Sequence, residues 1–391
     1  MSWNPKKIAL VAGVALTLGA TVMPVEAARI KVGDEIDYPV STPKAYPLGG
    51  PQRPVAWSET IVSPGATFLR LHFKKLHLPD GDFLTVSSPD GAELWTYTGK
   101  GPNGTGELWS FSVDGDTAIV ELHSGDRIEK GKARRYGLSI DRIAHGTAPL
   151  WEDGEPVSKI VCGTNGGRDA ACYASINTRP VARLSFQSGG SSYVCTGWLV
   201  AGSNSSTMLT NNHCVANQTE VSTVQARFNY QRTTCGGSTT ASYTTYTGGT
   251  FLKTSSALDY SLLTLQGNPE ATWGEYIATT KTPTTGMAIN FPQHPGGGLK
   301  LVGYWKDSAQ TLRCDVASVG GSYGYTTGSQ MAYSCDSAGG SSGSPIMDAG
   351  TGRIIGLHHL GGVGGSTCLN AATMMKNVCS NAGALLSCAT N

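Results

Sequence analysis

All ten cysteines of this 391-residue chain lie between Cys162 and Cys388. An even number of cysteines in an exported chain indicates disulfides, which form in oxidising compartments. No pair has the C-x-x-C spacing of a structural zinc site, so we expect neither a metal nor another cofactor. Because the region before Cys162 contains no cysteine, their distribution predicts two separately built units, of which the second is held together by disulfides.

The N-terminal residues 1–27 have the pattern of a signal peptide. Lys6 and Lys7 provide the basic start, residues 8–20 are apolar, and small residues at 25 and 27 predict cleavage after Ala27. The apolar run is too short to span a bilayer core of ~30 Å comfortably. We therefore expect a secreted, extracellular protein that has no membrane attachment once the signal is removed.

The pattern changes several times along the rest of the chain. Residues 28–55 are rich in proline and predict an extended leader, and residues 56–145 alternate short β-like runs with Asp-Gly turns, which is typical of hairpins. Residues 146–157 have the composition of a linker. We expect a small β-sandwich at 56–145 and a second unit at 158–391. The formal net charge of +1 gives no reason to expect a nucleic-acid partner.

The second unit also has the pattern of an all-β fold. It has many short strands with Gly, Ser and Thr turns, and the clearest predicted strands are residues 194–200, 260–265 and 353–357. Residues 370–386 are the one segment in which Ala, Met and Leu have helix-compatible spacing.

Three residues in this unit have the chemistry that acyl transfer requires, namely a base, an acid that orients it and a nucleophile. His213 ends an apolar run and is followed by Cys214. Asp259 opens a buried strand. Ser342 lies in the segment Gly-Gly-Ser-Ser-Gly-Ser-Pro at 339–345. Any one of these signals is more often structural, but their occurrence together in this order predicts a Ser-His-Asp triad.

The glycines around Ser342 leave backbone N–H groups unobstructed, and we expect those of Gly340 and Ser342 to form an oxyanion hole. Two other interpretations use the same residues. The segment also matches the G-x-S-x-G elbow of α/β-hydrolases, with Ser341 as nucleophile, although the strand-rich context disfavours that fold. A catalytically dead homologue that binds proteins is the non-enzyme alternative.

In this order, the three segments resemble those of chymotrypsin-like (trypsin-type) secreted serine endopeptidases. The cysteine layout is most similar to that of bacterial lysyl endopeptidases, through Cys162, Cys172, Cys195, Cys214, Cys235 and Cys368. The resemblance implies a double Greek-key β-barrel domain, with the triad between the barrels and polypeptides as substrates.

The same resemblance implies three disulfides, and the remaining four cysteines leave their connectivity open. The implied pairs are Cys162–Cys368, Cys172–Cys235 and Cys195–Cys214. For the others we expect Cys379–Cys388, which closes a short loop, and by elimination Cys314–Cys335.

The chain departs from mammalian relatives at Ser341, where those proteases carry the aspartate that pairs with a newly freed N-terminus. If the chain is a zymogen, its activation must therefore work differently. Residues 56–145 are either a propeptide that is removed or an accessory domain that is retained. We expect the mature protein to be a monomer.

Two arrangements of the substrate pocket compete. Asp336 precedes Ser342 by the offset of the acidic pocket residue of trypsin, which predicts Arg or Lys at P1, the residue before the cleaved bond. His358 resembles the histidine with which glutamyl endopeptidases bind an acidic P1. We further expect His359 and Gly361 to contact substrate. The lysyl endopeptidases carry their pocket carboxylate after the cysteine matching Cys368, and no acid follows there.

Overall fold

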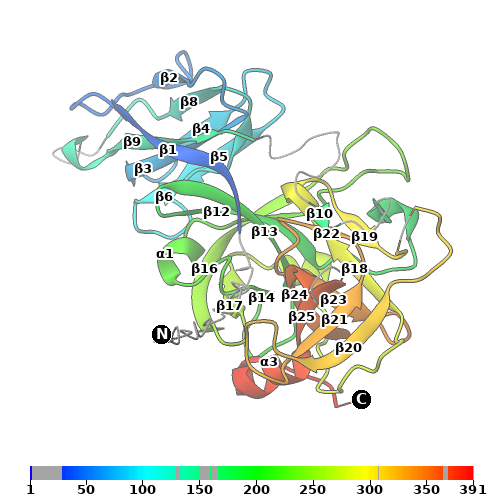
Figure 1. Cartoon of the computed structure of the whole chain (residues 1–391). Helices are drawn as coiled ribbons and strands as arrows, with labels where there is room; N and C mark the ends of the chain where they lie inside the picture. Colours follow the sequence, from blue (N-terminus) through cyan, green and yellow to red (C-terminus); the bar gives the residue numbers. More distant parts are fainter. Residues whose placement is uncertain are drawn as a thin grey trace.

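The computed structural model describes residues 1, 29–128, 133–148, 159–160, 166–306, 308–363 and 369–390. Figure 1 shows two β-rich parts, one coloured blue to cyan and the other green to red. The predicted all-β class is confirmed, since strands dominate and the helices are short. The predicted domain boundaries remain a prediction, as does the signal peptide, whose residues after Met1 lie outside the described part.

The first part is the predicted β-sandwich, in which two sheets enclose one apolar core. On β8 the side chains alternate strictly between half-buried and buried, as expected for a strand with one face on a core. One sheet consists of β2 (Trp57–Val62), β8 (Thr117–His123), β4 (Phe83–Ser87) and β5 (Leu94–Thr98). The other contains β1 (Ile30–Ser41), β9 (Gly137–Gly146), β3 (Phe68–His77), β6 (Leu108–Trp109) and β7 (Val113–Asp114), and the 3₁₀ turn η1 is Ala133–Arg135.

Strand β1 occupies much of the segment predicted as an extended leader, and it connects the two parts of the molecule. One edge pairs with β9, with Ile36 opposite Ile143. At its N-terminal end the strand pairs antiparallel with β13, with Ile30 opposite Val194. The first part and the first barrel therefore share one continuous sheet.

The first barrel is a closed ring of six antiparallel strands around an apolar core. Pairing of β13 with both β12 and β14 closes the ring. Its strands are β12 (Val181–Ser188), β13 (Ser191–Leu199), β14 (Thr207–Thr210), β15 (Gln225–Phe228), β16 (Thr244–Ser255) and β17 (Tyr260–Leu265), with the short helices α1 (Gln218–Val221) and α2 (Pro269–Trp273).

The second barrel is built from the next sheet, and a bridge between Ala288 and Asp315 brings the start of β18 next to β20. Its elements are β11 (Gly167–Asp169), β18 (Ile289–Gln293), β19 (Leu301–Gly303), β20 (Asp315–Gly321), β21 (Gln330–Ser334), β23 (Pro345–Asp348), β24 (Ile354–Val363) and β25 (Leu369–Met374). The pair β10 (Lys159–Ile160) and β22 (Ser337–Ala338) and the 3₁₀ turns η2 (Ala170–Cys172) and η3 (Pro295–Gly297) complete it. The predicted double barrel is confirmed.

The predicted helix over 370–386 is wrong in its first third. Strand β25 runs to Met374, helix α3 spans Met375–Ala382, and the 3₁₀ turn η4 is Gly383–Leu385. Strand β25 lies between β24 and β21, and its residues are buried on both faces. A strand that is buried on both faces has no period-2 alternation of apolar and polar residues, so spacing alone does not distinguish it from a helix.

Four of the five expected disulfides are present. They are Cys172–Cys235, Cys195–Cys214, Cys314–Cys335 and Cys379–Cys388. The expected Cys162–Cys368 bridge lies outside the described residues. In the described part of the chain, no helix has both the length and the apolar character needed to cross a membrane.

Buried polar contacts join the first part to the first barrel. Arg227 on β15 is 1% exposed, and its guanidinium lies 3.0 Å from the carboxylate of Glu93 and donates to Ser112 Oγ. Gln225, also on β15, accepts from the backbone N–H of Ser112 and donates to its hydroxyl. These contacts bury a charged pair between the two parts, and pairing of this kind is required to hold charges inside a protein.

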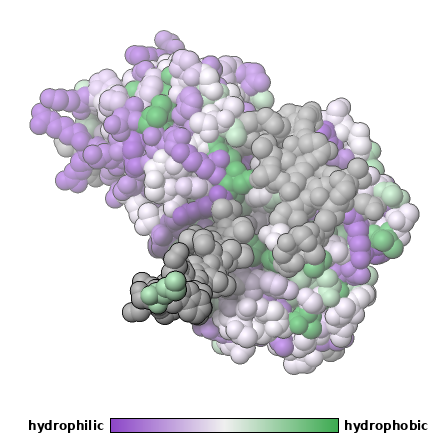
Figure 2. Space-filling model, viewed as in Figure 1, coloured by the Kyte–Doolittle hydropathy of each residue, from purple (hydrophilic) through white to green (hydrophobic). Residues whose placement is uncertain are grey.

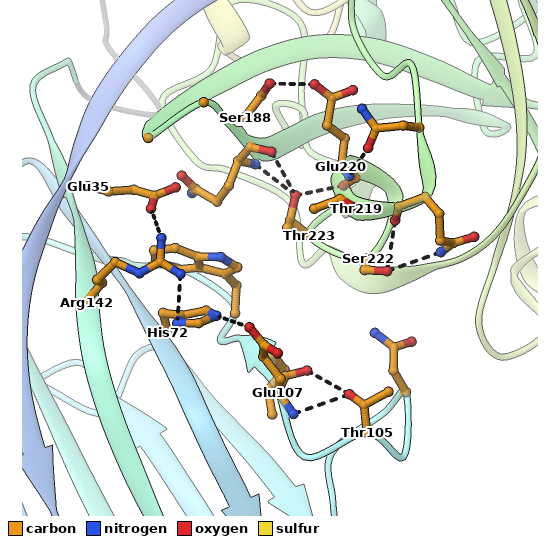
Figure 3. A pocket seen from close by; sticks show the side chains of 18 residues that line it. Glu35, His72, Thr105, Glu107, Arg142, Ser188, Thr219, Glu220, Ser222 and Thr223 are labelled. Atoms are coloured by element: carbon orange, nitrogen blue, oxygen red, sulfur yellow. Dashed lines mark hydrogen bonds and ion pairs between the residues drawn. The ribbon is translucent and has the colours of Figure 1, made fainter.

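A cleft of about 680 Å³ opens at the same junction (Figure 3). Two pairs of its titratable side chains are in contact. Arg142 lies 2.6 Å from Glu35, and His72 lies 3.4 Å from Glu107. Figure 2 shows hydrophilic residues gathered over the first part, while the visible face of the barrels is paler.

Candidate active site

His213 follows strand β14, and its ring is fixed by Asp259. The backbone N–H of His213 donates to Asp259 Oδ1 (2.9 Å), and His213 Nδ1 lies 2.7 Å from Asp259 Oδ2. Asn211 donates from its side-chain amide to the carbonyl of Asp259 (2.8 Å). Because both carboxylate oxygens are used, the ring is held in one orientation with its Nδ1 protonated and its Nε2 directed away from Asp259.

Asp259 precedes β17 in a left-handed conformation with φ of 48°, which aspartate tolerates better than most residues. Its side chain is 2% exposed. Burial acts to raise the pKa of this carboxyl, but the charge and hydrogen bonds of His213 outweigh it, so the pKa lies below its ordinary value. Tyr325 OH also donates to Oδ2 (3.2 Å), and His359 Nδ1 lies 4.0 Å from it.

Ser342 lies between β22 and β23, in a loop docked on strand β13. Its carbonyl accepts from the backbone N–H of Thr196 (2.8 Å). Gly343 has φ of 91°, and a Cβ there would lie 2.0 Å from the carbonyl oxygen of Thr196. Only glycine therefore permits this close approach.

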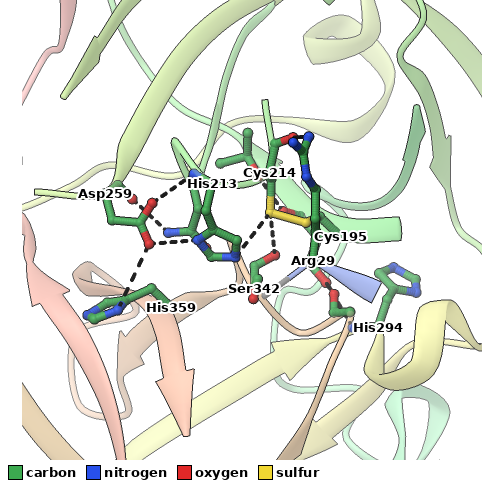
Figure 4. Close-up of a disulfide and its surroundings, with 12 residues drawn as sticks. Arg29, Cys195, His213, Cys214, Asp259, His294, Ser342 and His359 are labelled. Atoms are coloured by element: carbon green, nitrogen blue, oxygen red, sulfur yellow. Dashed lines mark hydrogen bonds and ion pairs between the residues drawn. A yellow bond between two sulfur atoms is a disulfide. The ribbon is translucent and has the colours of Figure 1, made fainter. Parts of the chain in front are cut away.

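The loop brings Ser342 next to His213 and the Cys195–Cys214 disulfide (Figure 4). His213 Nε2 lies 3.7 Å from Cys214 Sγ. No hydrogen bond joins the Ser342 hydroxyl to His213 within the described residues. Catalytic hydrogen bonds are often long or misaligned without substrate and shorten in the complex.

The turn before Ser342 is closely packed at Gly340. Gly340 has φ of 87°, and a Cβ there would lie 2.7 Å from the backbone nitrogen of Gly297. Its carbonyl is held by the hydroxyl of Thr196 (2.8 Å). In the described part of the chain, no acceptor takes up the N–H of Gly340 or of Ser342.

Ser341 does not have the environment of a nucleophile. Its side chain is fully buried, and its hydroxyl donates to Gln293 Oε1 (2.5 Å). The double-barrel fold also lacks the strand-to-helix elbow that the α/β-hydrolase interpretation requires. That alternative is therefore wrong.

Strand β22 begins at Ser337, close to β25, and Asp336 directly precedes it. Asp336 is 3% exposed, and its Oδ2 accepts from the backbone N–H of Gly166 (2.5 Å). Ser337 donates to the side-chain oxygen of Asn370 (2.8 Å), whose amide in turn donates to the carbonyl of Cys335. Across β24 and β25, Gly361 lies opposite Asn370.

His358 and His359 are both buried on β24. His358 Nδ1 lies 2.7 Å from Tyr333 OH, and its ring also bonds to the backbone of Ala371. Burial lowers the pKa of His358 to about 3. His359 Nε2 lies 2.6 Å from Gln330 Oε1, and burial lowers its pKa to about 4. Both rings are therefore neutral at pH 7.

Sequence reasoning missed the residues that support this site from elsewhere in the chain. Tyr325, Thr196 and Asn370 carry no local motif, and each reaches the site through strand pairing or a loop. Among the described residues, the one close group of potential metal ligands is Cys195, His213 and Cys214, and both of its sulfurs are in a disulfide.

Comparison with known proteins identifies the family of this chain. Residues 160–378, more than half of the chain, match the family "Lysyl endopeptidase, C-terminal domain". The lysyl endopeptidase of Pseudomonas aeruginosa is 30% identical over 332 residues, covering 79% of this chain and 68% of that protein. The secreted RxLR effector protein 73 of Plasmopara viticola is 27% identical over 340 residues, covering 81% of this chain and 80% of that protein.

Solved structures of proteases also align with the chain. A Glu endopeptidase is 22% identical with a TM-score of 0.40, covering 57% of this chain and 100% of that one. An HtrA-type protease with a tripeptide is 16% identical with a TM-score of 0.40, covering 55% of this chain and 62% of that one. From the family match and the relative in Pseudomonas aeruginosa, the chain belongs to the lysyl endopeptidase family and is a chymotrypsin-like serine endopeptidase.

Proposed function

We propose that His213, Asp259 and Ser342 are the catalytic triad of this endopeptidase. The observation that carries the proposal is the double hydrogen bond from His213 to Asp259, next to a serine on a glycine-rich loop. This arrangement fixes the tautomer in which Nε2 can accept a proton from a serine hydroxyl.

In the proposed mechanism, Ser342 Oγ attacks the carbonyl carbon of the substrate while His213 Nε2 takes the hydroxyl proton. The negative oxygen of the tetrahedral intermediate accepts from the N–H groups of Gly340 and Ser342. His213 then gives its proton to the leaving amine as the peptide C–N bond breaks, which leaves an acyl-enzyme. Water repeats the sequence and releases Ser342. Asp259 stays ionised and stabilises the imidazolium throughout.

We propose that the P1 preference is for Arg or Lys and that Asp336 provides the charge. Its buried carboxylate directly precedes β22, the strand that leads into the nucleophile loop. The relative in Pseudomonas aeruginosa is named a lysyl endopeptidase, which agrees with a basic P1. A carboxylate in a desolvated pocket forms strong, charge-assisted hydrogen bonds with guanidinium or ammonium groups.

The environment of His358 gives little support to the alternative, a preference for Glu at P1. Both sides of its ring bond to the protein, and its lowered pKa keeps it neutral. An acidic P1 would need a cationic or free N–H donor there. The dead-homologue alternative is disfavoured because all three triad residues are present at hydrogen-bonding or neighbouring positions.

We further propose that the protein acts as a secreted monomer, exported by cleavage after Ala27, on polypeptide substrates and not on nucleic acid or membranes. The name of the Plasmopara viticola relative describes a secreted protein, and the disulfides agree with an oxidising compartment. The buried Arg227–Glu93 pair favours an accessory domain that stays bound.

An active-site phosphonate probe tests the proposed triad. We expect the purified chain to be labelled at Ser342, and Ser342→Ala to abolish both labelling and peptide cleavage. Ser341→Ala is the matched control, since its neighbouring hydroxyl is buried on Gln293, and it should still be labelled. Labelling that survives Ser342→Ala would contradict the assignment.

A further inference from the structure

The N-terminal end of strand β1 lies against the active site. On one edge of β13, residues 191–194 pair with β1, and two residues further along Thr196 holds the nucleophile loop. Two residues of a strand span about 7 Å. Because β1 runs antiparallel to β13, the chain from Lys31 back to Arg29 leads toward Ser342.

Ile30 covers the wall next to the proposed oxyanion hole. Its Cδ1 lies 2.3 Å from the position that a Cβ on Gly339 would occupy. Gly339 directly precedes Gly340. A polypeptide bound at this place would meet the same backbone surface, which Ile30 now occupies.

Arg29 fills a site of its own beside the Cys195–Cys214 disulfide (Figure 4). Its guanidinium lies 3.0 Å from Glu220 Oε1 and 3.3 Å from the carbonyl oxygen of Cys214. The same group lies 4.6 Å from the ring centre of Tyr193, which is a cation–π distance. The site thus offers a carboxylate, a carbonyl and an aromatic face, and together these suit a basic side chain.

Glu220 belongs to the fold whether or not Arg29 is present. Its side chain is 8% exposed, and it accepts from Ser188 Oγ (2.5 Å) and from the backbone N–H of Ala216 (2.6 Å). These bonds fix the carboxylate in place. A buried carboxylate positioned in this way favours a cation beside it.

The position of the Arg29 site relative to the proposed triad indicates which side of the cleaved bond would bind there. In Figure 4, Asp259 and His359 lie on one side of the His213 ring, and Arg29 and the disulfide lie on the other. The acyl side of a substrate is expected along β24, which carries His359. The edge of β13 is therefore left for the leaving-group side, and an extended peptide can add to it as a strand.

We propose that the edge of β13 and the Glu220 carboxylate form a leaving-side subsite for Arg or Lys, and that Arg29 and Ile30 of the same chain occupy and block it. The inference rests on the proposed role of Ser342. It implies that β1 must detach at its N-terminal end before a long substrate binds, so apparent affinity falls by the fraction of open molecules.

The test compares two substrates on the full chain. One is a peptidyl ester with Arg at P1 and no residue after the cleaved bond. The other is a peptide with the same acyl side that extends three residues beyond it. We expect Ile30→Glu and Arg29→Ala each to raise the peptide-to-ester ratio of kcat/KM by about tenfold, the factor for one molecule open in ten. Lys31→Ala, on the same strand but exposed, is the matched control and should leave the ratio within about twofold.

The second arm measures the proposed charge preference. In the Ile30→Glu protein, peptides with Arg or Lys on the leaving side should be cleaved about tenfold faster than those with Ala, corresponding to one charge-assisted bond. Adding Glu220→Gln should remove that preference. A free peptide of residues 29–36 should inhibit competitively, and its version with Glu in place of Arg should not.

The outcomes separate the two proposals. If ester hydrolysis and phosphonate labelling persist in Ser342→Ala, the proposed function fails. If hydrolysis depends on Ser342 but the ratio stays unchanged in both Ile30→Glu and Arg29→Ala, the blocked subsite alone is wrong. Two separate variants are used so that misfolding of one, detected by its thermal midpoint, leaves the other as the deciding measurement.

Discussion

Asp259 is bound at both carboxylate oxygens by His213, through the backbone N–H at 2.9 Å and the ring Nδ1 at 2.7 Å. This double contact joins β17 to the loop after β14. Because one of the two contacts comes from the backbone, Asp259 fixes the His213 ring relative to its own main chain. We therefore expect a change at Asp259 to alter the tautomer of the His213 ring before it alters the fold.

The substitution Asp259→Asn should lower kcat by on the order of 10⁴-fold, because an amide that donates to Nδ1 selects the wrong tautomer. KM should change little, since Asp259 does not touch substrate. Steady-state kinetics on a peptidyl ester gives both values. As a control, Tyr325→Phe removes the more distant donor to the same carboxylate and should cost less than tenfold. Equal losses in the two variants would contradict this ordering.

Gly343→Ala should be strongly destabilising, because its Cβ would lie 2.0 Å from the carbonyl oxygen of Thr196. The backbone conformation alone costs about 1–3 kcal/mol, and the clash adds to that. Gly352→Ala is a matched control, since Gly352 also has positive φ (72°) but open space around its Cβ. Denaturant unfolding should show a clearly larger loss for Gly343→Ala, and similar losses would disprove the close approach.

Stability should decrease as the pH falls from about 6.5 toward 4. The pKa of His358 is lowered to about 3 and that of His359 to about 4, so between these values and about 6.5 the unfolded chain binds more protons than the folded one. Each such group therefore favours unfolding as the pH drops. In His358→Gln, thermal midpoints measured across this range should vary less steeply with pH. An unchanged slope would mean that His358 does not carry the effect.

The substitution Asp336→Asn should weaken transition-state binding of substrates with Arg or Lys at P1 by about 2–5 kcal/mol, as expected when one member of a buried charge pair is removed. The kcat/KM for these substrates should fall accordingly. Cleavage after uncharged residues should be much less affected. A peptide library that varies only P1 measures both. Cleavage after Glu alone, in the unmodified chain, would rule out the basic pocket.

Removing the buried charge at the junction of the two parts should destabilise the protein. Glu93→Ala leaves Arg227 buried without its carboxylate, and breaking such a pair costs about 3–5 kcal/mol. The exposed pair of Arg127 and Asp126 provides the control, because Asp126→Ala should change stability by less than about 1 kcal/mol. Urea titrations of both variants test the difference. Equal stability would show that the two parts are held together by other contacts.

Much of the protein was predictable from its sequence. Alternating strands and Asp-Gly turns indicated the all-β class, because side-chain period and turn chemistry are local properties. The order of His213, Asp259 and Ser342 identified a candidate triad before any geometry was known. The pairing of Cys379 with Cys388 followed from the short loop that it closes, and the structure confirms it.

Tertiary structure decided what depends on contacts between distant segments. The segment 370–374 became a strand because β24 and β21 lie on either side of it. Residues 30–41 of the predicted leader became strand β1 because β9 and β13 offered edges to it. Arg29 came to lie on Glu220, 191 residues away in sequence, near the loop that carries Ser342. Local sequence determines which conformations a segment prefers, whereas its partners are set by the packing of the whole chain.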